Sequence, residues 1–226
     1  MNILVTGADG NLGQAVVQKY LSEGHRVLGT MLPKRHVEAF EAQANFTRLE
    51  ADLMHEGPLS EALTEQQLPI HVAVFTVGGF GMGNIGNTPL EDLDKMLKLN
   101  VHTAFVSAKA LFNHMKDHGE GGRIVLVSSR PGLEPKQGAA TLSYTLSKAA
   151  LPALADILNV EGADHGIVTS VIAPSLIDTP PNREAMPQAD FSKWVKPSEI
   201  AEVVYFATTE KGSILREPIF KLYGDS

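Results

Sequence analysis

Short apolar runs rich in β-branched residues alternate along this chain with longer stretches in which apolar residues recur at helical spacing. The apolar runs predict strands at residues 2–5, 26–30, 46–50, 72–77, 123–128, 168–173 and 219–222. The longer stretches predict helices at residues 14–23, 36–44, 59–65, 90–115, 144–160 and 197–208. This alternation is typical of a mainly parallel sheet with helices on both faces. We therefore expect a doubly wound α/β fold with about seven strands.

Three irregular segments, residues 78–89, 130–143 and 175–196, each follow a predicted strand. Ligands of open α/β sheets bind beyond the carboxyl ends of the strands, so we expect the three segments to surround one crevice. Segment 175–196 is rich in proline and carries Phe191 and Trp194, either as core residues or as parts of a substrate lid. The chain shows no repeat and no linker, which predicts one domain over residues 1–226.

A glycine-rich turn, Thr-Gly-Ala-Asp-Gly-Asn-Leu-Gly at residues 6–13, joins the first predicted strand to the first helix. Gly7 permits a tight turn, Gly10 lets the backbone approach a pyrophosphate, and Gly13 allows the helix to pack closely on the strand. The N-terminus of the helix then offers N–H groups and a positive dipole end to the anion. This context predicts a Rossmann-like dinucleotide site.

The end of the second predicted strand carries no acidic residue, which many NAD sites use to bind the ribose 2′-hydroxyl. Lys34 and Arg35 follow instead. Cations at this place attract a 2′-phosphate, so the sequence favours NADP(H) over NAD(H). Asp9 would repel a phosphate, and we expect its side chain to point into solvent.

Tyr144 and Lys148 lie four residues apart at the start of a predicted helix and therefore share one face. A nearby ammonium group lowers the pKa of a tyrosine toward the working pH. Such a tyrosine can exchange a proton with a carbonyl or alcohol oxygen while hydride moves at a nicotinamide. These two residues are the candidate acid–base pair.

Together these motifs resemble, over nearly the whole chain, those of the short-chain dehydrogenase/reductase family. The resemblance implies NADP(H)-dependent hydride transfer to or from a small carbonyl or alcohol. It implies that Ser129 holds the substrate oxygen, with Ser128 and Ser143 as alternatives, and that Asn100 supports a proton relay to Lys148. It also implies a set of cofactor-binding residues: Gly7, Gly10, Asn11, Leu12, Gly13, Lys34, Arg35, Asp52, Leu53, Val77, Gly78, Tyr144, Lys148, Pro174, Ile177 and Thr179. Without the resemblance, the residues alone favour a turn-capping role for Asp52.

Other functions remain as alternatives. Residues 77–84 and 178–194 are similar to the corresponding loops of the family's dihydropteridine reductases, which suggests pterin reduction with NADH. The Gly-x-x-Gly-x-x-Gly spacing is closer to the family's epimerase-like branch, which retains NAD tightly. A sensor that binds NADP(H) without turnover is the alternative from another class, although its expected mark is the loss of Tyr144 or Lys148.

Composition narrows the range of partners. A net charge of −7 argues against nucleic acid as a partner, and the absence of cysteine excludes disulfides and thiolate metal sites. His114 and His118 lie four residues apart without a third ligand in view, so we expect no metal. No apolar run is long enough to cross a membrane, and we expect a cytoplasmic protein. The family resemblance implies a homodimer or homotetramer.

Overall fold

The computed structural model, which describes residues 1–225, contains a seven-stranded sheet in the order β3-β2-β1-β4-β5-β6-β7. Every pair of neighbouring strands is parallel. The strands are β1 (Asn2–Thr6), β2 (Arg26–Met31), β3 (Phe46–Glu50), β4 (Val72–Phe75), β5 (Gly122–Val127), β6 (Ile167–Pro174) and β7 (Ile219–Leu222). The expected doubly wound α/β fold is confirmed, and β4 is shorter than predicted because it ends at Phe75.

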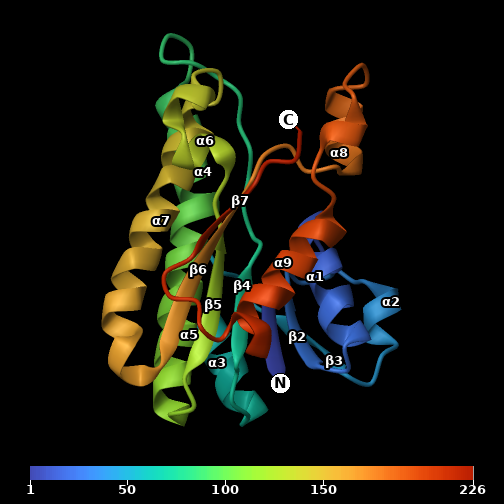
Figure 1. Ribbon diagram of the computed structural model, residues 1–226, viewed down its shortest axis with the longest axis vertical. Coiled ribbons are helices and arrows are strands. Elements are labelled where there is room, and N and C mark those ends of the chain that lie inside the picture. The colour runs from blue at the N-terminus through green and yellow to red at the C-terminus, as the bar shows by residue number, and fades with distance from the viewer. Residues whose placement is uncertain (226) are drawn as a thin grey trace.

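Helices cover both faces of the sheet, as Figure 1 shows. One face packs against α3 (Pro58–Gln66), α5 (Thr103–His118) and α7 (Leu142–Gly162). The other packs against α1 (Asn11–Ser22), the short α2 (Glu38–Glu41) and α9 (Pro197–Thr208). Each face buries its own apolar cluster, which explains why the central strands read as continuous apolar runs.

The helix expected at residues 90–115 is divided into two α-helices. α4 (Leu90–Leu97) passes into a π-helical segment, Lys98–His102, which continues into α5. The irregular segments contain further short helices, α6 (Arg130–Leu133) and α8 (Pro180–Ala185). These segments and the start of α7 lie at the upper end of the sheet in Figure 1, where the strands end.

The carboxyl edge of the sheet is also the place where the strand order changes direction. β1 pairs with β2 on one side and with β4 on the other, so the chain winds outward in both directions from β1. Ligands of doubly wound sheets bind in the crevice at this point. The glycine-rich turn after β1 therefore stands at the centre of the candidate site. None of the helices within residues 1–225 is long and apolar enough to span a bilayer.

Candidate active site

The glycine-rich turn has the backbone geometry that its sequence predicts. Gly7 has φ +64°, and the N–H of Gly10 donates to the Gly7 carbonyl at 2.9 Å. A Cβ on Gly13 would lie 2.1 Å from the Gly7 oxygen, so only glycine fits there. No side chain caps α1 and no acidic residue occupies its first turn. The first N–H groups of this helix have no partner within the helix, and the turn suits the pyrophosphate of a dinucleotide.

The basic loop after β2 lies directly beside this turn. Gly7 and Ala8 donate backbone hydrogen bonds to the Thr30 hydroxyl and carbonyl, at 3.2 and 3.1 Å. The Arg35 N–H closes a tight turn onto Leu32 at 3.1 Å. The expectation that Asp9 points into solvent is wrong. Its carboxylate accepts from Arg35 Nε at 2.8 Å because the turn and the loop bring the opposite charges together.

The expected adenine-binding pair, Asp52 and Leu53, follows β3. The Asp52 carboxylate accepts from the Met54 N–H at 2.9 Å, so this side chain caps a turn, while Leu53 is buried. A cavity of about 420 Å³ opens beside this loop, against α4. Its lining residues are Met54, Glu91, Asp94, Lys95, Lys98 and Leu99.

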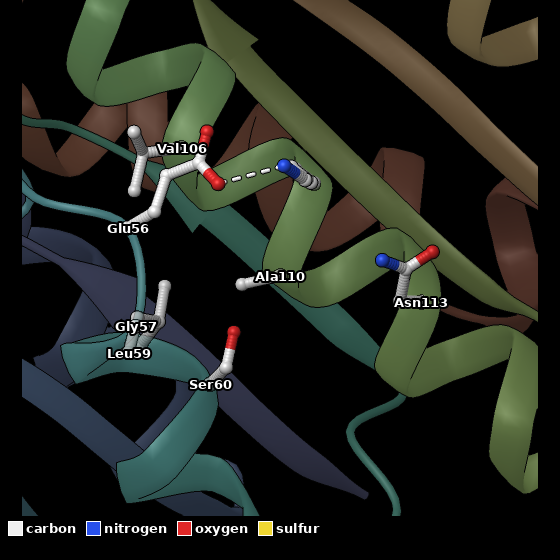
Figure 2. A pocket seen from close by; sticks show the side chains of 8 residues that line it. Glu56, Gly57, Leu59, Ser60, Val106, Ala110 and Asn113 are labelled. Carbon is white, nitrogen blue, oxygen red and sulfur yellow. Dashed lines mark hydrogen bonds and ion pairs between the residues drawn. The ribbon is translucent and has the colours of Figure 1, made fainter.

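A second, smaller cavity of about 80 Å³ lies between α3 and α5 and is shown in Figure 2. Glu56, Ser60 and Asn113 are among the residues that line this cavity. The Glu56 carboxylate accepts a hydrogen bond from Lys109 Nζ at 2.7 Å. None of the candidate catalytic or cofactor-binding residues lines it.

The structure brings Tyr144 and Ser129 together, although they come from different segments. Ser129 follows β5, where its hydroxyl caps α6 by accepting from the Gly132 N–H at 3.1 Å. It also lies close enough to the phenol of Tyr144, in the first turn of α7, to lower the pKa of that phenol. Two hydroxyl groups therefore converge beyond the carboxyl end of β5, where a substrate oxygen can approach both.

The two alternative serines are placed differently. The buried Ser128 hydroxyl donates to the Lys148 carbonyl at 2.8 Å. That carbonyl needs a donor because its helical partner at position 152 is Pro152, which has no N–H. The Ser143 hydroxyl is buried without a hydrogen-bond partner. Of the three serines, Ser129 is the one whose hydroxyl meets Tyr144.

The electrostatics of the pair differ from the expectation. Burial raises the pKa of Tyr144, and the hydrogen bond with Ser129 lowers it only in part. Burial also lowers the pKa of Lys148 from 10.5 to about 8. The ammonium group of Lys148 donates to the Val127 carbonyl at 2.8 Å. The pKa of Tyr144 is therefore moved by burial and by Ser129, upward and not in the expected direction, and Lys148 is not among the causes.

Asn100 occupies the middle of the π-helical segment and is buried. Its amide accepts from the Gly79 N–H at 2.9 Å and donates to the Gly79 carbonyl at 3.1 Å. It also donates to the Ser147 hydroxyl at 2.9 Å, and Ser147 donates in turn to the Tyr144 carbonyl at 2.7 Å. The side chain therefore ties the loop after β4 to the start of α7. π-Helical segments of this kind often occur at functional sites, which agrees with the choice of Asn100 as a candidate site residue.

Gly78 and Val77 complete this part of the crevice. A Cβ on Gly78 would lie 2.6 Å from Asn100 Oδ1 and 3.2 Å from Lys148 Nζ, so the loop passes directly over both side chains. Val77 packs against the glycine-rich turn, since a Cβ on Gly7 would lie 2.9 Å from its Cγ2. The loop after β4 thus bridges the candidate cofactor site and the candidate catalytic residues.

Sequence reasoning missed Phe80 as a residue of the site. Its ring meets the ring of Tyr144 edge-on, with 5.0 Å between centroids, while 63% of Phe80 stays exposed. The loop is held in place by Gly83, which donates to the Ala140 carbonyl and accepts from the Leu142 N–H at 2.8 and 2.9 Å. A large aromatic residue within a glycine-rich loop was the available signal.

Segment 175–196 is closed at its base. Ile177 and Val195 form an isolated β-bridge, and the Val195 N–H donates to the Leu176 carbonyl at 3.0 Å. Thr179 caps α8 by accepting from the Asn182 N–H. In Figure 1, α8 stands above the end of the sheet. The segment's tip is thus joined to the core through a narrow base.

Two further contacts place the aromatic residues of this segment. Trp194 is buried, and its ring lies 4.8 Å from the ring of Phe191. Arg183 stacks over Phe191 and pairs with Asp178. Pro174 is the last residue of β6. Trp194 therefore belongs to the base of the segment and not to its tip.

Within residues 1–225, no group of three or more His, Asp or Glu side chains is placed to hold a metal ion.

Comparison with known proteins matches residues 1–190 to the family model for short chain dehydrogenases. The 2-(R)-hydroxypropyl-CoM dehydrogenase of Xanthobacter autotrophicus is 32% identical over 189 residues, which cover 78% of this chain and 74% of that enzyme. The chain belongs to the short-chain dehydrogenase/reductase family. It is therefore an NAD(P)-dependent oxidoreductase.

Other members of the family resemble the chain over more of its length. The dihydropteridine reductase of Dictyostelium discoideum is 27% identical over 215 residues, covering 94% of this chain and 89% of that enzyme. A family oxidoreductase from Burkholderia thailandensis has the same fold, with a TM-score of 0.87 and 24% identity, covering 99% of this chain and 91% of that structure. The sequence-based assignment to the family, including its dihydropteridine reductases as relatives, is confirmed.

Proposed function

We propose that the chain transfers hydride between NADP(H) and a small carbonyl or alcohol substrate, with Tyr144 as the acid–base residue. The observation that carries the proposal is the approach of the Ser129 hydroxyl to the Tyr144 phenol, with the buried Lys148 one helical turn further along α7. Two neighbouring hydroxyl groups of this kind can bind one substrate oxygen between them.

The cofactor would lie across the carboxyl edge of the sheet. Its pyrophosphate would bind the glycine-rich turn at the N-terminus of α1. Because no side chain caps this helix, its first N–H groups are free to bind an anion. The residues that would line this part of the site are Gly7, Gly10, Asn11, Leu12 and Gly13. Asp52 and Leu53 would line the adenine site. Val77, Gly78, Pro174, Ile177 and Thr179 would line the nicotinamide half, with Tyr144 and Lys148. When bound, the nicotinamide supplies or accepts the hydride.

The cofactor preference follows from the loop after β2. Lys34 and Arg35 are the cations of this loop, and the end of β2 offers no carboxylate. A phosphate on the 2′-oxygen of the ribose would meet positive charge there, which favours NADP(H).

The chain's own residues then divide the chemistry among them. In carbonyl reduction, the raised pKa of Tyr144 keeps its phenol protonated and ready to donate to the substrate oxygen. Ser129 holds the same oxygen and orients it. Lys148 supplies a buried cation one helical turn further along α7, and Asn100 fixes the loop and helix that position Tyr144. In the reverse direction, the tyrosinate accepts the proton of the alcohol.

Pterin reduction is the second candidate, because two independent observations favour it. Phe80 presents an exposed aromatic ring beside Tyr144, which suits stacking on a flat heterocycle. The similarity to a dihydropteridine reductase also extends over 94% of the chain. Ser129 and Asn100 are nevertheless the residues that ordinary carbonyl chemistry uses, and we rank that chemistry first.

The test is a titration of the purified protein with NADPH and NADH, followed by cofactor fluorescence. Turnover is then measured with aldehydes, ketones and a quinonoid dihydropterin. We expect tighter binding of NADPH, and a loss of turnover of about 10²–10⁴-fold in Tyr144→Phe with cofactor affinity retained. Turnover of the dihydropterin alone would replace the carbonyl proposal with the second candidate. Retained activity in Tyr144→Phe would refute the mechanism.

A further inference from the structure

The ion pair between Asp9 and Arg35 joins two parts of the cofactor site that separate strands contribute. Asp9 lies in the phosphate-binding turn after β1, and Arg35 lies in the basic loop after β2. Asp9 Oδ2 accepts from Arg35 Nε at 2.8 Å, with 19% of the Asp9 side chain and 66% of the Arg35 side chain exposed. A carboxylate thus stands within a turn that is otherwise suited to an anion.

The position of Asp9 is fixed by its backbone rather than by the ion pair. The Gln14 side chain donates to the Asp9 carbonyl at 2.8 Å, and the N–H of the neighbouring Ala8 donates to the Thr30 carbonyl. Arg35 is exposed beyond its guanidinium contact. Exposed ion pairs contribute little to stability, so Arg35 can exchange Asp9 for another anion at small cost.

The loop that carries Arg35 is also held by its backbone. Lys34 has φ +66°, a conformation that is uncommon for residues other than glycine. Arg48 Nε donates to the Arg35 carbonyl at 3.0 Å, and Arg48 itself pairs with Glu41 and Glu50. Nε and Nη1 of Arg48 thus have carboxylates of their own, whereas its buried Nη2 has no hydrogen-bond partner. Among these groups, Arg35 is the cation that faces Asp9, and an unusual backbone conformation holds it there.

We propose that Asp9 reduces the discrimination between NADP(H) and NAD(H). Its carboxylate, in the glycine-rich turn after β1, takes the place of the acidic residue that is missing at the end of β2. There it accepts a hydrogen bond from the ribose 2′-hydroxyl of NAD(H). With NADP(H), Arg35 leaves Asp9 and pairs with the 2′-phosphate. The inference rests on the proposed dinucleotide site and adds a residue that lets it accept both cofactors.

The experiment compares affinities for NADPH and NADH in the wild type and in Asp9→Asn, by cofactor fluorescence. Adenosine 2′,5′-bisphosphate and adenosine 5′-monophosphate serve as probes that need no turnover. The substitution keeps the side-chain shape and removes the charge. We expect the preference for NADPH over NADH to rise at least tenfold, with the same direction for the two probes.

Two further variants isolate the cause. Arg35→Gln should weaken NADPH binding and leave NADH binding unchanged. When Asp9→Asn is added to Arg35→Gln, the preference for NADPH over NADH should rise less than when Asp9→Asn is made in the wild type. Glu23→Gln removes one exposed, ion-paired carboxylate from the far end of α1 and controls for net charge. It should leave the ratio of the two affinities unchanged.

The possible outcomes separate this inference from the function on which it rests. Equal changes for both cofactors in Asp9→Asn, or the same shift in Glu23→Gln, would overturn the role of Asp9 and leave the dinucleotide site standing. An equal gain with and without Arg35 would overturn the exchange. Wild-type protein that is folded, free of nucleotide and binds neither cofactor would refute the proposed function and this inference together.

Discussion

At the scale of single residues, the two adjacent serines after β5 have separable tasks. The Ser129 hydroxyl meets Tyr144, whereas the Ser128 hydroxyl satisfies the carbonyl that Pro152 leaves without a helical donor. We expect Ser129→Ala to lower turnover about 10²-fold and, because it removes the cap of α6, to cost about 1 kcal/mol of stability. Ser128→Ala should retain turnover and destabilise the fold by about 1–3 kcal/mol, because it leaves a buried carbonyl unpaired.

A second substitution makes this comparison decisive. Pro152→Ala restores an N–H that can donate to the Lys148 carbonyl, so Ser128→Ala should cost less stability in that background. Urea unfolding measures stability and steady-state kinetics measure turnover. A larger loss of turnover in Ser128→Ala than in Ser129→Ala would reverse the assignment of the two serines.

Lys148 allows a prediction about stability and pH. Burial lowers its pKa in the folded protein from 10.5 to about 8, so folding at pH 7 must bury a charge that the unfolded chain solvates. Lys148→Met should therefore stabilise the protein at pH 7, by up to about 3 kcal/mol less the lost hydrogen bond to Val127, while abolishing turnover.

The size of this destabilisation changes with pH in a defined window. Below pH 8 both states carry the charge and the cost is complete; between pH 8 and 10.5 the folded state releases its proton first and the cost declines. The stability gain of Lys148→Met should thus be largest at pH 7 and smaller at pH 9.5, by denaturant unfolding at both values. A gain that stays constant would show that the charge is not its cause. Lys148→Arg is the matched control: it keeps the buried charge and should therefore not show the stability gain of Lys148→Met.

At the scale of elements, the boundaries of strands and helices followed from the sequence wherever apolar periodicity was strong. The helix at residues 90–115 was predicted, but its π-helical segment was not. A π-helical turn contains one residue more than an α-helical turn, and no pattern in the neighbouring sequence predicts it here. The segment is held by hydrogen bonds of Asn100 with Gly79 and Ser147, which are far away in the sequence. The Asp9–Arg35 pair escaped prediction for the same reason, since two different strands bring it together.

Segment 175–196 is the element whose motion can be predicted. Its base is hydrogen-bonded through Asp178 and Val195, whereas α8 at its tip is six residues long and carries no buried residue. We expect amides of residues 180–193 to exchange hydrogen faster than the base and faster than α9. Hydrogen-exchange mass spectrometry measures both.

Cofactor and substrate provide the test of its role as a lid. If the segment closes over the site, exchange in residues 180–193 should slow when both are bound, more than in α2, which serves as the reference surface helix. Unchanged exchange in the ternary complex would remove the lid from the proposed mechanism. Slow exchange in the free protein would show that the tip is already packed.

At the scale of the whole molecule, the seven-stranded parallel sheet and its crevice could be anticipated because they depend on the order of elements and not on individual contacts. The identity of the substrate could not be anticipated in this way. The loops that would contact the substrate include the one that carries Phe80, beside Tyr144. Backbone hydrogen bonds from Gly83 to residues 140 and 142 hold this loop in place. Such loop contacts leave no periodic pattern in the sequence.

The outer surfaces of α5 and α7 carry exposed apolar side chains that predict self-association. Leu146, Ile157 and Val160 are 49%, 56% and 76% exposed and share one face of α7, and Phe105 of the neighbouring α5 is 50% exposed. The helices lie side by side in Figure 1. Monomers rarely leave such apolar area open to water, so we expect these faces to be buried in a homodimer or in a larger symmetric assembly built from it.

The oligomeric state tests this directly. Ile157→Lys combined with Val160→Glu places charges of both signs on the α7 face, keeps net charge constant, and should convert the dimer to monomer in light scattering coupled to size exclusion. Ile214→Lys, at a site that is 86% exposed and outside both helices, is the control and should leave the dimer intact. A wild-type protein that is monomeric at high micromolar concentration would contradict the prediction. Dissociation by the control variant alone would place the interface near residue 214 instead.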